Sequence, residues 1–347
     1  MAVRAFITGL AGTRMTASER SFLREASPWG LILFKRNIAT PNQVVALVSD
    51  FRDALGRTDA PVLIDQEGGR VSRLAPPHWP DYPPGAAYGR VYQLDPERGL
   101  AAARLGARLI ASDLATLGIT VDCLPVADVP TIGADPVIGD RAYGTTVPQV
   151  VALADAIAQG LMAGGVLPVL KHIPGHGRAN VDSHFKLPVV RDARTALAAS
   201  DFAAFSALAS LPLGMTAHVV YAAIDPDQPA TTSSIMINDV IRDAIGFEGA
   251  LMTDDIAMGA LSGSIVERTR AALAAGCDLI LHCNGNLKQM QQVASNACDL
   301  EGAAAERVSA ALYGRQHPAE IDLAAAWTEF ARMMDGVWAA PARVGTA

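Results

Sequence analysis

The chain has 347 residues, of which 50% are hydrophobic and 18% are charged, and its formal net charge at pH 7 is −7. This composition can bury a sizeable core and excludes a disordered chain. The acidic balance and the lack of a lysine- or arginine-rich block argue against nucleic acid or an anionic membrane as the main partner. The length suits one large α/β barrel as well as two smaller domains.

The sequence offers no segment that predicts export or membrane insertion. The apolar run before Gly9 is too short for a secretory signal, and no stretch of about 18 apolar residues occurs. The four cysteines have no Cys-x-x-Cys spacing and stand in apolar or helical surroundings; they are Cys123, Cys277, Cys283 and Cys298. This pattern predicts free, buried thiols and a cytoplasmic protein.

Short apolar runs with strand character alternate along the chain with alanine-rich stretches of helical period, which is typical of a parallel sheet with crossover helices. The predicted strands are 5–9, 30–34, 61–65, 121–126, 167–171, 214–218, 250–254 and 278–282. Apolar residues recur every three or four positions in the predicted helices. These are 41–55, 97–117, 147–163, 194–208 and 265–275.

Eight strands with helices between them predict a closed (β/α)8 TIM barrel. We expect a single catalytic domain over residues 1–340, with a C-terminal helix at 322–338 and a tail at 341–347. An open doubly wound sheet is the main alternative, because strand counts from one sequence are often wrong by one or two.

A barrel carries its chemistry at the carboxyl ends of its strands and in the loops that follow them. The seventh predicted strand runs directly into Asp254 and Asp255. A buried ionised aspartate is costly unless it is paired or used. Asp254 lies closer to the barrel axis and is the candidate functional carboxylate, whereas Asp255 is expected to cap the next helix.

The loop after the fifth strand contains several histidines. Pro174 and Gly175 exclude a regular helix there, so His172 and His176 cannot share a helical face as metal-binding pairs usually do. A zinc site is therefore a weak alternative.

Further along the same loop, Asp182 stands two residues before His184. A carboxylate at this spacing can orient an imidazole and raise its basicity, which makes His184 a candidate general acid/base. An ordinary surface loop explains the pair equally well.

Four cationic or imidazole side chains follow strands three to five and can donate hydrogen bonds to the hydroxyl, acetamido or carboxylate groups of a ligand. They are Arg73, Arg141, Lys171 and His172. Three tryptophans are possible sugar-stacking platforms, although core or interface packing is the favoured interpretation; they are Trp29, Trp79 and Trp327.

Three segments carry a specific signature: Lys171-His-Ile-Pro-Gly-His-Gly177, Asp182-Ser-His184 and Thr253-Asp-Asp255. Together they resemble the β-N-acetylglucosaminidases of glycoside hydrolase family 3. Ile64-Asp-Gln-Glu-Gly-Gly-Arg-Val71 and Ile138-Gly-Asp-Arg141 strengthen the resemblance, which runs from about residue 30 to residue 283.

The resemblance implies a retaining exo-hydrolase that removes terminal, non-reducing β-linked N-acetylglucosamine from muropeptide fragments during peptidoglycan recycling. It further implies a cytoplasmic enzyme. A monomer is expected because the sequence shows no long apolar surface helix, and no cofactor or metal is expected. By this resemblance Asp254 is the nucleophile and His184, assisted by Asp182, is the acid/base. The sugar-binding positions are Asp65, Arg73, Arg141, Lys171 and His172.

The chain departs from the family pattern at three places that remove no reacting group. Thr253 replaces a usual serine, Ile173 replaces a frequent phenylalanine, and a glutamate often found after Met258 is missing. A neutral histidine does not repel an anionic acceptor, so a phosphorylase side activity is a further hypothesis. The competing hypotheses are a β-glucosidase or β-xylosidase of the same family, a non-catalytic muropeptide-binding barrel and a metal-dependent amidohydrolase.

Overall fold

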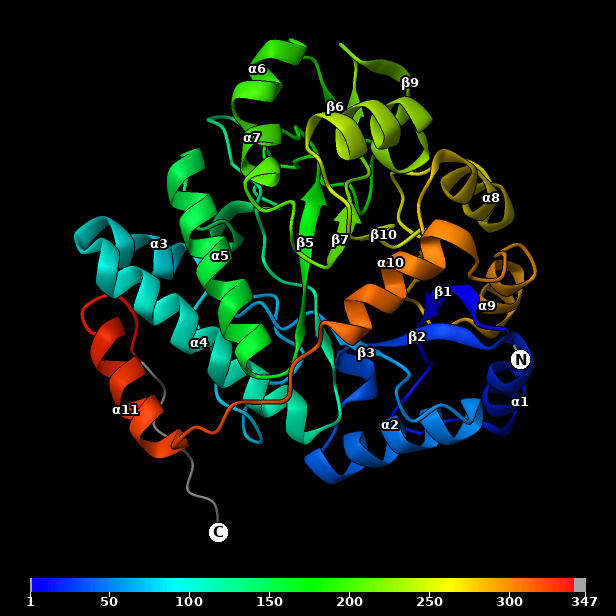
Figure 1. The fold of residues 1–347 in the computed structure, drawn as a ribbon, viewed down its shortest axis with the longest axis horizontal. Coiled ribbons are helices and arrows are strands. Elements are labelled where there is room, and N and C mark those ends of the chain that lie inside the picture. Colours follow the sequence, from blue (N-terminus) through cyan, green and yellow to red (C-terminus); the bar gives the residue numbers. More distant parts are fainter. Residues whose placement is uncertain (1, 340–347) are drawn as a thin grey trace.

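Eight parallel strands form the centre of the computed structural model, which describes residues 2–339 (Figure 1). They are β1 (Arg4–Thr8), β2 (Pro28–Leu33), β3 (Val62–Ile64), β4 (Val121–Asp122), β5 (Leu167–Ile173), β7 (Leu213–Thr216), β10 (Ala250–Met252) and β11 (Ile280–His282). The neighbour order is β10-β7-β5-β4-β3-β2-β1-β11, and a parallel bridge between Met252 and Leu279 joins β10 to the β11 side. The predicted barrel and its eight strands are confirmed, and the open-sheet alternative is wrong.

Residues alternate between the inside and the outside of the barrel. Ile7, Ile32 and Leu63 pack in a core cluster inside the barrel, whereas their strand neighbours Phe6 and Leu31 belong to the larger core between strands and helices. This alternation follows from the two-residue period of a strand. The barrel interior is therefore a packed core, and side chains that act on a ligand are expected beyond the carboxyl ends of the strands.

Helices surround the barrel (Figure 1). They are α1 (Ala17–Ala26), α2 (Pro41–Leu55), α3 (Gly85–Leu94), α4 (Pro96–Thr116), α5 (Val147–Ala163), α6 (Arg194–Ala199), α7 (Asp201–Ser206), a π-helix (Met236–Ala244), α8 (Ile265–Ala275), α9 (Leu287–Ala294), α10 (Gly302–Tyr313) and α11 (Leu323–Met334). The predicted helices at 41–55, 147–163 and 265–275 are confirmed at these bounds, and the helix predicted at 97–117 is α4.

Local capping signals explain why α2 begins and ends where the sequence predicts. The Thr40 side chain accepts a hydrogen bond from the backbone N–H of Gln43, Pro41 stands at the first helical position, and Gly56 ends the helix in the left-handed conformation with φ 65°. A threonine N-cap, a proline at the first turn and a C-terminal glycine each favour these bounds without tertiary contacts.

The prediction of one helix over 194–208 is wrong. The helix breaks at Ser200, whose φ and ψ are −130° and −82°, and α7 starts afresh at Asp201. The side chains of Ser200 and Asp201 turn instead toward Arg178, which donates to the Ser200 hydroxyl at 2.7 Å and to Asp201 Oδ2 at 2.6 Å. A polar contact from a distant loop overrides the local helical pattern.

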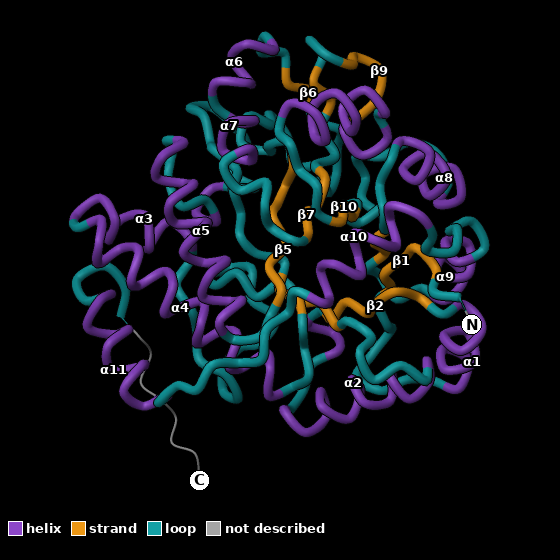
Figure 2. Tube along the Cα trace, in the orientation of Figure 1, coloured by secondary structure: helices purple, strands orange, loops and turns teal. Residues whose placement is uncertain are grey.

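A small three-stranded sheet lies beyond the carboxyl end of the barrel, above β5, β7 and β10 in Figure 2. It contains β6 (Val189–Val190), β8 (Val220–Tyr221) and β9 (Asp225–Pro229), and β8 pairs with both of the others. The Tyr221 hydroxyl donates to the carbonyl of Gly175, so this sheet braces the loop that follows β5.

The C-terminal helix α11 packs beside α4, where Arg98 Nε donates to the carbonyl of Met333 at 2.6 Å (Figure 1). Asp322 caps α11, which is shorter than the predicted 322–338 helix. The predicted tail at 341–347 lies outside the described residues. Within residues 2–339, the helices are all too short or too polar to cross a membrane.

The four cysteines are free thiols, as the spacing predicts. Cys123, Cys277 and Cys283 are buried, but Cys298 is exposed, so the prediction of burial is wrong at this position. Cys298 lies in the connection between α9 and α10, where a side chain is not covered by the packed face of a helix.

Candidate active site

A cavity of about 340 Å³ lies at the carboxyl ends of the barrel strands. Its wall includes Ile32 and Phe34 near the end of β2, Met215 of β7 and Cys283 after β11. All eight residues that the sequence predicts as a site also line it: Asp65, Arg73, Arg141, Lys171, His172, Asp182, His184 and Asp254. The structure thus brings together residues that come from five different strands or loops.

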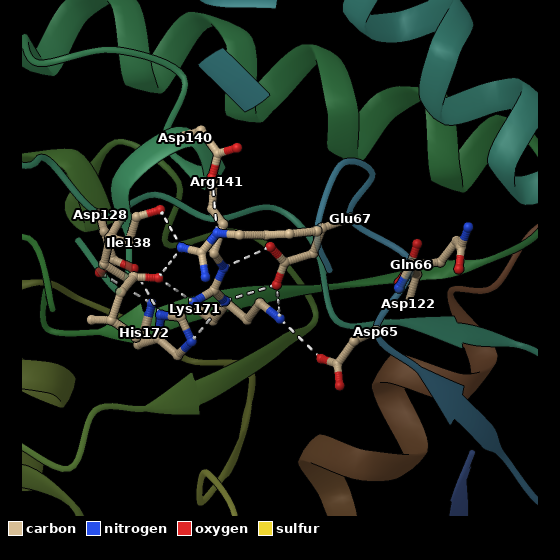
Figure 3. A network of polar contacts seen from close by, with 12 residues as sticks. Asp65, Gln66, Glu67, Asp122, Asp128, Ile138, Asp140, Arg141, Lys171 and His172 are labelled. Atoms are coloured by element: carbon tan, nitrogen blue, oxygen red, sulfur yellow. Dashed lines mark hydrogen bonds and ion pairs between the residues drawn. The ribbon is translucent and has the colours of Figure 1, made fainter. Parts of the chain in front are cut away.

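One wall of this cavity is a buried network of ion pairs, which we call the ionic wall (Figure 3). Lys171 Nζ lies 3.0 Å from Asp65 Oδ1 and 2.6 Å from Glu67 Oε1. Arg141 binds the same Glu67 through two contacts of 2.8 Å, and Arg73 Nη2 lies 2.9 Å from Asp65 Oδ2. Each acidic group therefore has two cationic partners.

Burial and ion pairing have opposite effects on these groups. Burial raises the pKa of Glu67, but Arg141 and Lys171 outweigh it and hold this pKa to about 2. Burial likewise opposes ionisation of Asp65, while Lys171 and Arg73 keep its pKa below the ordinary aspartate range. Burial lowers the pKa of Lys171, yet Glu67 and Asp65 raise it above the ordinary lysine value. All of these groups are charged at neutral pH.

An irregularity in β5 explains how two consecutive residues reach the same cavity. Lys171 pairs with Met215 and Ile173 pairs with Thr216, so His172 is an extra residue on the β5 side of the ladder. In a regular strand, Lys171 and His172 would point to opposite faces. The bulge redirects one of them, a role that bulges often have near active sites.

The imidazole of His172 is oriented by Asp128, which is completely buried. His172 Nδ1 and Asp128 Oδ2 are 2.7 Å apart, while His172 Nε2 faces Arg141 Nη2 at 3.5 Å. Burial opposes ionisation of Asp128, but His172 lowers its pKa below the ordinary value. The ionised carboxylate accepts a hydrogen bond from Nδ1–H, and this orientation turns Nε2 toward the Arg141 guanidinium.

Glu67 and Asp128 were not predicted as site residues, although both follow strand ends. A charge count gives a usable signal for Glu67: Arg73, Arg141 and Lys171 supply three cations near one end of the barrel, and Asp65 alone cannot balance them. Buried cations need partners. The search for a second carboxylate would have led to Glu67, whereas Asp128 gives no comparable signal.

Asp254 follows the end of β10 and lies on a turn that several hydrogen bonds hold in place. The backbone N–H of Asp255 donates to Asp254 Oδ1 at 2.7 Å. Burial acts to raise the pKa of Asp254, but the nearby imidazoles of His218 and His172 and this N–H keep it below the ordinary aspartate value. Asp254 is therefore a carboxylate at neutral pH.

Asp255 does not cap the next helix, so that prediction is wrong. The cap of α8 is Ser264, and Asp255 Oδ1 instead accepts hydrogen bonds from the backbone N–H groups of Ala257 at 3.0 Å and Cys283 at 3.2 Å. His218 Nε2 lies 3.1 Å from the carbonyl of Asp255. These contacts fix the turn that carries Asp254 between β7, β10 and β11.

The Asp182–His184 pair faces the same cavity from the loop after β5. His184 Nδ1 lies 2.6 Å from Asp182 Oδ1, and the His184 side chain is 58% exposed. Although partial burial opposes it, hydrogen bonds from His184 lower the pKa of Asp182. An ionised carboxylate on Nδ1 leaves Nε2 as the nitrogen that can exchange a proton with a ligand.

The remaining sequence predictions concern aromatic platforms and metals. Trp29 and Trp79 are buried in the core, and Trp327 packs against Tyr82 and Phe330 with ring centroids 5.4 Å and 5.7 Å away. These tryptophans are packing residues, which confirms the favoured interpretation of the sequence, and they do not line the cavity. Within residues 2–339, no three histidine, cysteine, aspartate or glutamate side chains are grouped so that they could hold a metal ion.

Comparison with known families decides the class of this site. The family model described as the glycosyl hydrolase family 3 N terminal domain matches residues 2–312. The chain belongs to glycosyl hydrolase family 3. This confirms the resemblance that the sequence motifs indicate, and it makes the protein a glycosidase.

Similar proteins match most of this chain. The chain is 41% identical over 288 residues to a beta-hexosaminidase from Alkalilimnicola ehrlichii, with 82% of each chain covered. Native NagZ from Neisseria gonorrhoeae matches in structure with a TM-score of 0.86 and 28% identity, covering 96% of this chain and 99% of that one. A beta-N-acetylglucosaminidase from Paenibacillus matches at a TM-score of 0.84 and 28% identity, covering 95% of this chain and 66% of the other.

Proposed function

We propose that this family 3 glycosidase is a retaining exo-β-N-acetylglucosaminidase. The observation that supports this most directly is a single cavity that contains a carboxylate, Asp254, and an exposed imidazole–carboxylate pair, His184 and Asp182. At about 340 Å³ the cavity is at the small end of ligand sites, which span roughly 300–1,000 Å³. A small cavity suits one terminal sugar rather than a chain of sugars.

In the proposed mechanism, Asp254 attacks the anomeric carbon while His184 protonates the departing glycosidic oxygen. The glycosyl ester on Asp254 is then hydrolysed by a water molecule from which His184 removes a proton, so the acid of the first step is the base of the second. Asp182 keeps the ring oriented and stabilises the imidazolium. The low pKa of Asp254 supports its role, because the nucleophile must be ionised.

We propose that the ionic wall binds the sugar through Asp65, Arg73, Arg141, Lys171 and His172. The Lys171 ammonium has three N–H donors, of which two point to Asp65 and Glu67, so one is available for a sugar oxygen. Arg141 binds Glu67 through Nε and Nη2, and Nη1 donates one of its two N–H groups to the Val137 carbonyl at 3.3 Å, so its other N–H group is available. Asp65 accepts from hydroxyl groups. These polar contacts suit the hydroxyl and acetamido groups of N-acetylglucosamine.

The natural substrate that we propose is the terminal, non-reducing N-acetylglucosamine of muropeptide fragments in peptidoglycan recycling. The names of the relatives, beta-hexosaminidase and NagZ, support the sugar. We further propose a cytoplasmic enzyme without a cofactor or metal, and the four free thiols suit a reducing compartment. We also propose that the enzyme is a monomer.

The decisive assay compares release of p-nitrophenol from its β-N-acetylglucosaminide and its β-glucoside by the wild-type protein and by Asp254→Asn. We expect cleavage of the first substrate only, and loss of that activity in the variant with unchanged thermal unfolding. Preferred cleavage of the glucoside would replace the proposal with a β-glucosidase. Activity retained in Asp254→Asn would move the nucleophile elsewhere, and a wild type inactive on both sugars would favour a binding protein.

A further inference from the structure

A side-chain hydrogen bond closes the part of the loop after β5 that ends directly before His184. His176 Nε2 and Ser183 Oγ are 2.9 Å apart. Both residues are only 3% exposed, although the residues that follow Ser183 lie at the surface. The bond closes residues 177–182 into a loop, and Ser183 directly precedes His184. We call this contact the clasp.

The His176 end of the clasp is held by Asp128, the carboxylate that also orients His172. The backbone N–H of His176 donates to Asp128 Oδ1 at 2.6 Å, and the other oxygen of Asp128 holds the ring of His172. Burial, together with the nearby His172, lowers the pKa of His176 to about 4. The imidazole is therefore neutral in the physiological range and adds no charge beside the sugar site.

The Ser183 end meets the loop that follows β10. The backbone N–H of Ala260 donates to the carbonyl of Ser183 at 3.1 Å, and that of Gly259 donates to the carbonyl of His184 at 3.0 Å. A Cβ atom at Gly259 would lie 2.9 Å from this His184 carbonyl oxygen, so the two loops are in close contact. These bonds secure the backbone, and the clasp adds a hydrogen bond from the Ser183 side chain.

We propose that the clasp positions the Asp182–His184 pair over Asp254, and that His176 and Ser183 are positioning residues for protonation of the leaving group. This inference rests on the proposed function. An imidazole that is 58% exposed has little packing to hold it in place. The neighbouring buried hydroxyl of Ser183, fixed to a neutral histidine, supplies the restraint that packing does not.

A positioning role for the acid predicts a pattern that general destabilisation would not produce. Ser183→Ala should lower kcat on a β-linked N-acetylglucosamine disaccharide roughly tenfold, the worth of about 1.4 kcal/mol from one hydrogen bond. The p-nitrophenyl glycoside needs little proton donation, so its kcat should change less than about twofold. KM should stay constant, because the ionic wall is untouched, and Ser183→Thr should restore the wild-type pattern.

A second readout does not depend on catalysis. Lys186 is exposed two residues beyond His184, so trypsin can cleave there when the loop opens. We expect trypsin to cut Ser183→Ala after Lys186 roughly tenfold faster than wild type. Mass spectrometry of the fragments measures the rate of this cut. The matched control is Ser295→Ala, an exposed serine at the C-terminal end of α9 whose hydroxyl donates to the carbonyl of Gln291. Its cleavage and kinetics should equal those of wild type.

Unchanged cleavage of Ser183→Ala after Lys186 would overturn the clasp whether or not the protein is an active glycosidase. Equal losses of kcat on the disaccharide and the aryl glycoside would also overturn it, because they would indicate damage unrelated to the leaving group. If the wild type hydrolyses neither substrate, the proposed function fails, and the proteolysis rates alone then decide whether the clasp holds the loop.

Discussion

The ionic wall and the loop that carries His184 face the same cavity but are built in opposite ways. The Lys171 side chain is 2% exposed and lies between two carboxylates, whereas the His184 side chain is 58% exposed and relies on Asp182. Charges buried in the wall must be paired as the protein folds, because an unpaired buried charge is too costly. The His184 side chain carries no such constraint.

This difference separates two tasks. A binding wall that is assembled by folding holds its donors in place before the sugar arrives, which lowers the entropic cost of binding. An exposed acid/base loop can admit a substrate and release a product. We therefore expect changes in the wall to affect stability and KM, and changes in the loop to affect kcat.

The largest effect on activity should come from a substitution in the loop that carries His184. His184→Ala should lower kcat on a disaccharide by about 10²- to 10⁴-fold, the usual worth of a general acid/base, and should affect an activated aryl glycoside less. The midpoint of thermal unfolding should stay the same, because the side chain is mostly exposed. His317→Ala, another exposed histidine, serves as the control. A large fall in unfolding temperature would contradict the contrast between loop and wall.

A substitution in the ionic wall should lower the stability of the folded protein. Glu67→Gln leaves Lys171 and Arg141 short of a buried counter-charge, so the free energy of unfolding should fall by about 3 kcal/mol and KM should rise. Chemical denaturation and steady-state kinetics measure the two effects. Glu329→Gln, which breaks an exposed pair with Arg332 on α11, should leave both unchanged. Equal losses in the two variants would remove the distinction between buried and exposed pairs.

The pH dependence of stability sharpens the same point. The pKa of Glu67 is about 2 in the folded protein, against about 4.3 in an unfolded chain. Because the pKa is lower in the folded state, ionised Glu67 stabilises the protein at pH values above its unfolded-state pKa. This contribution is lost as the pH falls toward the folded-state pKa of about 2. Wild type should therefore exceed Glu67→Gln in stability at neutral pH, and the gap should close as acid is added. A gap that is constant with pH would refute the linkage.

The smallest loss of stability should follow from changes around Arg178, in the loop after β5, because several polar contacts hold this residue at once. Arg178 binds Ser200, Asp201 and Asp192. Ser200→Ala removes one of these partners and should cost about 1 kcal/mol in unfolding free energy. Ser21→Ala, an exposed serine on α1 that bonds Glu25, is the control for loss of a surface hydroxyl. A loss equal to that of Glu67→Gln would show that this anchor is as critical as the ionic wall.

The sequence alone determined the barrel, the order of its strands and the bounds of α2, α5 and α8. Strand and helix periods are local properties, and signals such as Thr40, Pro41 and Gly56 act within one turn. The position of Asp65, Lys171 and Asp254 at strand ends also follows, since the carboxyl ends of parallel strands meet at one face of a barrel. All eight predicted site residues accordingly line one cavity.

Only the tertiary structure decided how these residues are paired and held. Glu67 meets Arg141 across 74 positions of the chain, and Asp128 meets His172 across 44. The bulge at His172 and the break at Ser200 likewise arise from distant partners. Burial and charge compensation act through space, between segments whose distance in the chain carries no information about their contact, so no local pattern encodes these pairings.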